Sequence, residues 1–119
     1  MNRLSDSTIK FYKDLLRVND WDIYVYEQVA LDSFGACKTL YSSDSAIIRI
    51  DNEMSFEEKV KTLIHELLHL KDIDERGIVE QEVEGTLHTM YTRFHERFIE
   101  GQAQIIYALT KDAVLKLDT

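Results

Sequence analysis

Proline is absent from this 119-residue sequence, cysteine occurs once and glycine only four times. The single Cys37 excludes an internal disulfide and favours a reducing compartment, where it serves as a small apolar residue. No segment approaches the roughly 18 apolar residues that a membrane-spanning helix needs. The segment MNRLSDSTIK lacks the apolar stretch of a secretion signal. We therefore expect a cytoplasmic protein without membrane association.

Basic residues are also in the minority. The chain has 14 Lys and Arg against 22 Asp and Glu, which gives a net charge of −8 at pH 7. This balance disfavours a broad basic surface, so we expect no nucleic acid partner. A hydrophobic content of 45% in 119 residues is enough for one domain, residues 1–119, with its own core. Composition leaves the oligomeric state open.

The spacing of apolar residues predicts an α+β fold with a small sheet of about three strands. Ser5 or Asp6 is suited to cap the first helix, and Ser55 with Glu58 forms a capping box for the second. The expected elements are a helix at 5–18, strands at 21–29, 33–41 and 45–51, a helix from 55 to about 72, and a long helix from 78 with a bend near Gly101. The expected apolar face of the long helix consists of Val79, Val83, Leu87, Met90, Phe94 and Phe98.

The segment HELLH, residues 65–69, carries the strongest functional signal. Helix positions four apart share a face, so His65 and His69 can present ring nitrogens to one metal ion. Zinc favours such ligands, and a catalytic zinc site keeps one position for water. Glu66 lies next to the first histidine, where its carboxylate can act as the general base on that water. The alternative, an unliganded histidine pair among leucines, would require other polar partners.

A third protein ligand is needed, and several residues after His69 qualify. Glu80 falls within the expected apolar face of the long helix, where a carboxylate is costly unless it binds something, so it is our first choice. Glu84 is the alternative, followed by His88. Glu84 is equally suited to hydrogen-bond a histidine ligand and orient its ring. Alternatively, EQEVEG binds no metal and is only the acidic first turn of a helix, where negative charge is favourable.

Stabilisation of an oxyanion is a further requirement of peptide hydrolysis. Tyr91 lies on nearly the same face of the long helix as Glu80 and is therefore a candidate. A partly buried structural tyrosine is the competing interpretation.

TLIHELLHLKD followed by EQEVEGTLHTMY resembles the small gluzincin-type zinc metallopeptidases, especially ImmA/IrrE-like proteins and phage-encoded minigluzincins, and more distantly the SprT-like proteins. In the ImmA/IrrE-like proteins and minigluzincins, a glutamate on the next helix binds the metal together with HExxH. That glutamate is often followed, four residues on, by a polar residue, and Glu80 and Glu84 have this spacing. The segments WDIYVY, FGACK and AIIRID resemble the short meander that precedes the zinc helix. The alanine-asparagine pair typical of ImmA/IrrE proteins is replaced by Val83 and Glu84.

The resemblance implies a minigluzincin-like, zincin-like fold with one zinc ion, in which the HExxH helix packs on a long glutamate-bearing helix. It implies a peptidase that cleaves a dedicated protein target, such as a regulator of a phage or mobile element, in a bacterial or phage-infected cell. The alternative is a non-catalytic protein-binding module, for example an inhibitor of a host or phage factor, in which zinc is structural or absent.

Overall fold

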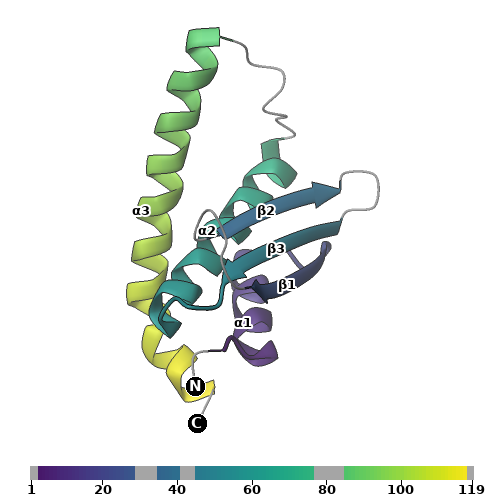
Figure 1. The fold of residues 1–119 in the computed structure, drawn as a ribbon, viewed down its shortest axis with the longest axis vertical. Coiled ribbons are helices and arrows are strands. Elements are labelled where there is room, and N and C mark those ends of the chain that lie inside the picture. The colour runs from purple at the N-terminus through teal and green to yellow at the C-terminus, as the bar shows by residue number, and fades with distance from the viewer. Residues whose placement is uncertain (1–2, 29–34, 41–44, 77–84, 118–119) are drawn as a thin grey trace.

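The computed structural model describes the backbone of residues 3–28, 35–40, 45–76 and 85–117, and the side chains of 3–28, 45–71 and 95–117. These residues form three helices and a three-stranded sheet, so the expected α+β class is confirmed (Figure 1). The elements are α1 (Asp6–Leu16), β1 (Asp22–Gln28), β2 (Gly35–Leu40), β3 (Ser45–Asp51), α2 (Phe56–Arg76) and α3 (Gly85–Leu117). In the part of the chain described, no helix combines the length and apolar composition needed to span a bilayer.

The sheet differs from the expected meander. Strand β3 lies between β1 and β2, and it pairs in parallel with β1 and antiparallel with β2. Its central position follows from composition, because Ala46, Ile48 and Ile50 alternate along one face and are all fully buried. Strand β1, in contrast, leaves Tyr24 and Tyr26 about half exposed, as suits an edge strand.

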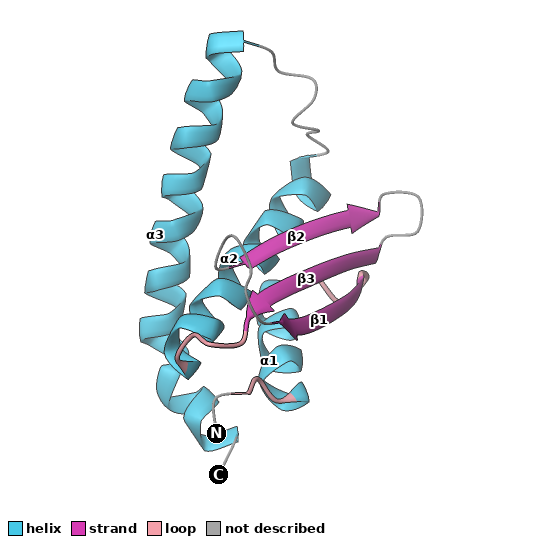
Figure 2. Cartoon of the chain, in the orientation of Figure 1, coloured by secondary structure: helices cyan, strands magenta, loops and turns pink. Residues whose placement is uncertain are grey.

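Helix α2 covers one face of the sheet (Figure 2). The side of α2 that enters the core is a regular apolar stripe. The Ser55 hydroxyl accepts the Glu58 backbone N–H at 3.2 Å, which confirms the predicted cap. The fully buried residues of the stripe are Val60, Leu63, Ile64, Leu67 and Leu70. This spacing of three and four residues directs one side of α2 into the core, and the polar residues between them lie on its flank.

Helix α1 begins at the cap that Ser5 provides, since its hydroxyl accepts the Thr8 N–H at 3.1 Å. Its buried Tyr12 reaches the far end of α3, where the hydroxyl lies 2.6 Å from Thr110 Oγ1. Burial raises the pKa of Tyr12, so this hydroxyl stays neutral. Helix α3 is therefore held at its C-terminal end by α1 and along its middle by α2.

Of the predicted apolar face of the long helix, the structure describes only the Phe98 side chain. Val79 and Val83 lie outside the described residues, and so do the side chains of Leu87, Met90 and Phe94. Ile99, Ala103 and Val114 are buried, whereas Phe98, which we expected in the core, is 58% exposed. The helix continues without interruption through Gly101, where an added Cβ would meet nothing within 4 Å. The apolar residues before position 95 therefore predicted the wrong core face for the described part of α3.

A buried ion pair connects α2 to β1 and to the N-terminal segment. Lys59, whose side chain is 3% exposed, places its Nζ 2.6 Å from Glu27 Oε1. The other oxygen of Glu27 accepts the backbone N–H of Leu4 at 3.1 Å. A buried charge is costly unless it is paired, so this contact constrains how three segments meet.

Replacing Lys59 with methionine keeps the aliphatic stem but removes the ammonium. The Glu27 carboxylate, whose side chain is 14% exposed, then loses its cation, and we expect the free energy of unfolding to fall by about 3 kcal/mol. Lys10→Met is the control, because it removes an exposed pair with Asp14 and should change stability by less than about 0.5 kcal/mol. Urea denaturation measures both. Equal losses in the two variants would contradict the prediction.

Candidate metal centre

The HELLH segment lies in the middle of α2, and its two histidines lie on the flank of the helix, beside the apolar stripe. His65 and His69, one helical turn apart, direct their rings to the same side, and their Nε2 atoms are 3.2 Å apart. Each side chain is 18% exposed. The apolar stripe that packs on the sheet thus fixes the orientation of both histidines toward α3.

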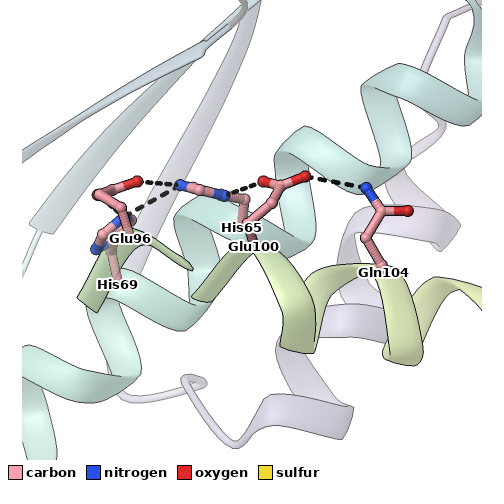
Figure 3. A network of polar contacts seen from close by, with 5 residues as sticks. All are labelled: His65, His69, Glu96, Glu100 and Gln104. Atoms are coloured by element: carbon pink, nitrogen blue, oxygen red, sulfur yellow. Dashed lines mark hydrogen bonds and ion pairs between the residues drawn. The ribbon is translucent and has the colours of Figure 1, made fainter. Parts of the chain in front are cut away.

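Helix α3 brings a third donor, Glu96, to this pair. Its Oε2 lies 3.1 Å from His65 Nε2, and its Oε1 lies 2.9 Å from His69 Nε2. The three residues are a group whose ligand atoms all lie within 4.8 Å of one another, and this group could hold a metal ion. Figure 3 shows Glu96 and both rings meeting between the two helices.

The separation of the two histidine nitrogens fits a tetrahedral ion of zinc-like size. Ligands at the usual zinc distances of 2.0–2.1 Å stand roughly 3.3–3.4 Å apart in a tetrahedron. The two histidine nitrogens are 3.2 Å apart, close to this value, whereas each of them contacts a different oxygen of Glu96, at 3.1 and 2.9 Å. The Glu96 side chain would therefore have to shift to bring one oxygen and both nitrogens around the same ion. Two imidazole nitrogens and one carboxylate oxygen also form a common ligand set of catalytic zinc.

The second nitrogen of His65 is held by α3 as well. Its Nδ1 lies 2.9 Å from Glu100 Oε2, and Gln104 donates to the other oxygen of Glu100 at 2.9 Å. The hydrogen bond from Gln104, and to a lesser degree that from His65, lowers the pKa of Glu100 although partial burial opposes them. Glu100 therefore remains a carboxylate near neutral pH and can only accept hydrogen bonds. The proton of a neutral His65 ring must then be on Nδ1.

This tautomer has a consequence for the opposite nitrogen. In the neutral ring Nε2 carries a lone pair, and it faces the Glu96 carboxylate at 3.1 Å. Two electron-rich atoms at that distance repel each other unless a positive charge joins them. A metal ion between them provides that charge, and so does a second proton on His65. The contact is therefore favourable when a metal ion lies between the two atoms or when they share a proton.

Glu66 lies directly beside this group and is only 8% exposed. Burial raises the pKa of Glu66 to about 7, Glu96 adds to the increase, and the charge of His65 opposes it. A divalent cation next to the carboxyl would lower this pKa again. Glu66 is therefore a group that can take and return a proton near neutral pH.

A cavity of about 390 Å³ opens next to the group. Its wall is formed by α2, α3 and the loop before α2, and it includes His65, Glu66 and Glu100. The remaining lining residues are Met54, Glu58, Lys61, Thr62 and Gln104. A small group of a bound molecule, such as one side chain of a peptide, could therefore reach Glu66 and His65 through this cavity.

Several residues predicted from the sequence cannot be compared with this group. Glu80 and Glu84 lie outside the described residues. His88 and Tyr91 belong to α3, but their side chains lie outside the described set. The roles assigned to these four residues stay predictions.

Glu96 and Glu100 were missed in the sequence analysis. They have the same spacing of four residues that drew attention to Glu80 and Glu84, so the signal was present. The predicted third ligands were Glu80, Glu84 and His88, and the expected apolar face with Phe94 and Phe98 lies opposite Glu96 on the helix. His95 also lies near this group, because its ring centroid is 5.4 Å from that of His69.

Comparisons of the chain with protein-family models, with curated proteins and with solved structures found no match. The described residues offer three side chains on two helices that could hold a metal ion, a buried carboxyl beside them, and a cavity lined by His65 and Glu66.

Proposed function

We propose that this protein is a zinc-dependent peptidase of the HExxH type with a zincin-like arrangement of α2 and α3. The observation that carries the proposal is the convergence of His65, His69 and Glu96 beside the buried Glu66. We assign the third ligand to Glu96 instead of Glu80, because its carboxylate lies within 3.1 Å of both histidine nitrogens.

When bound, zinc supplies Lewis acidity, which lowers the pKa of a coordinated water to about 7 and polarises a carbonyl group. Glu66 accepts the proton of the attacking water and then gives it to the amide nitrogen that leaves. One carboxyl suits both steps when its pKa is near the working pH. Glu100 keeps the proton of His65 on Nδ1, so that Nε2 remains a donor to the metal.

A peptide in extended conformation is the substrate that suits the fold. An edge strand such as β2 can accept a further strand through backbone hydrogen bonds. The cavity of about 390 Å³ provides room for one side chain next to Glu66. A single dedicated protein target fits this limited recognition surface better than broad digestion does, a step that rests on the resemblance to small regulatory peptidases.

A non-catalytic binding module is the second candidate function. The observation in its favour is that a doubly protonated His65 would satisfy both Glu96 and Glu100 without a metal. In that case the network would serve only to join α2 to α3, and neither Glu66 nor the cavity would have a chemical role. Metal content separates the two candidates.

Apo protein, purified without a metal-binding tag and resupplied with zinc, should contain one zinc per chain by elemental analysis. His69→Ala and Glu96→Ala should lose it, because three protein ligands are the minimum for a stable catalytic site. Glu80→Ala and Glu84→Ala should retain it. Loss with Glu80→Ala and retention with Glu96→Ala would reverse the ligand assignment, and absence of zinc from the wild type would favour the binding module.

Glu66→Gln should retain zinc and fold but reduce peptide hydrolysis by about 10²–10⁴-fold, because the amide cannot accept the proton of water. Glu58→Gln, on the same helix and lining the same cavity, is the matched control and should keep most of the activity. New peptide termini in a protein mixture, counted by mass spectrometry, provide the measurement. No new termini with the zinc-loaded wild type, or equal numbers with Glu66→Gln, would refute the proposed chemistry.

Glu100→Ala should weaken zinc binding by about 10–100-fold, since His65 loses the partner that orients its ring. Gln104→Ala removes only the contact behind Glu100 and should have a smaller effect. Competition with a chromophoric chelator gives both dissociation constants. Unchanged affinity in Glu100→Ala would mean that this carboxylate has no part in the metal centre.

A further inference from the structure

The outer side of α3 carries a row of exposed apolar side chains. Phe98, Ile105 and Leu109 are 58%, 55% and 80% exposed. At 100° per residue the three lie within about 40° of one line along the helix, over a length of about 16 Å. Single exposed apolar residues are ordinary, but a continuous row of large ones marks an interaction surface. We call these three residues the outer stripe.

The outer stripe is separate from the surfaces already described. The buried residues Ile99, Ala103 and Val114 lie about 100–160° around α3 from Phe98, and Glu96 faces α2. Helix α3 is therefore apolar on two sides, of which only one is used in the fold. A helix of that kind packs a partner on its second side.

We propose that the partner is a second copy of this chain, with the two α3 helices antiparallel about a two-fold axis at Ile105. In this arrangement the two Ile105 side chains meet at the axis. Leu109 of one copy is level with Gly101 of the other, four residues from the axis in each case. No atom lies within 4 Å of where a Cβ of Gly101 would be, so the glycine leaves an open place for the leucine.

Charge supports the same arrangement. Arg97 and Asp112 are both exposed and flank the outer stripe on the same side. An antiparallel two-fold pairing brings equivalent flanks together, which places Arg97 of one copy within about one residue of the level of Asp112 of the other, twice per dimer. A parallel two-fold pairing would instead set each flank against the opposite flank of the partner, so Arg97 and Asp112 would not meet. A self-complementary surface of this kind is typical of two-fold dimers.

The inference is independent of the proposed peptidase function. Because the outer stripe faces away from Glu96 and Glu100, the dimer leaves the cavity beside Glu66 open. Three large side chains per copy form a small interface, so we expect a reversible dimer with a dissociation constant of about 1–100 μM.

Sedimentation velocity of the full chain from 1 to 300 μM tests the proposal. The wild type should shift from monomer to dimer with concentration, and Ile105→Glu should weaken association at least about 100-fold, since each dimer contains the change twice. Leu117→Glu is the matched control, because it makes the same kind of change on α3 about 100° away from the stripe and should leave the dimer intact. A dimer that survives Ile105→Glu, or one that Leu117→Glu disrupts equally, would overturn the assignment of this face.

A charge exchange tests the antiparallel orientation. Arg97→Asp and Asp112→Arg should each weaken the dimer, and the double variant should restore it, because the pair is re-formed with reversed signs. Failure of the double variant to recover would overturn this orientation. A wild type that stays monomeric at 300 μM would overturn the proposal as a whole, and binding to phosphatidylcholine vesicles would then assign the outer stripe to a lipid surface.

Discussion

The packing of α2 on the sheet is the constraint on which the rest of the structure depends. The stripe from Val60 to Leu70 buries its large side chains completely against β3 and its neighbours. Once that face is packed, the helical period of 3.6 residues determines the direction in which His65 and His69 point. The same burial removes Glu66 from water, which raises its pKa to about 7. Core packing therefore sets both the direction of the candidate ligands and the protonation of the candidate base.

Helix α3 turns this local arrangement into a possible site. It supplies Glu96 between the histidines and Glu100 behind His65, so the two helices share one polar network. Two carboxylates so close to Glu66 make the surroundings strongly negative, in a chain whose net charge is already −8. Such a cluster favours binding a dication, and it explains why Glu96 adds to the raised pKa of Glu66.

The sequence could predict features that depend on residues close together along the chain, but not features that depend on contacts between distant segments. Ser55 as a cap and the shared face of His65 and His69 depend on residues within one helical turn, and the structure agrees with both. The strand order and the position of Glu96 depend on contacts between distant segments. Glu96 was missed because an apolar periodicity gives a helix two possible core faces when both sides carry large residues, and only the packing of Ile99 and Ala103 on α2 decides between them.

The error over Phe98 is itself informative. A large aromatic residue with regular spacing from other apolar residues normally lies in a core, yet here the core uses Ile99 on a neighbouring line of the same helix. In the described part of α3, Phe98 lies with Ile105 and Leu109 on a line of exposed residues and not in the core. Helix α3 thus carries three separate sets of residues around its circumference: a core face, a polar edge with Glu96 and Glu100, and the outer stripe. Because the three sets hardly overlap, a change in the outer stripe can test the proposed association while the candidate metal ligands remain in place.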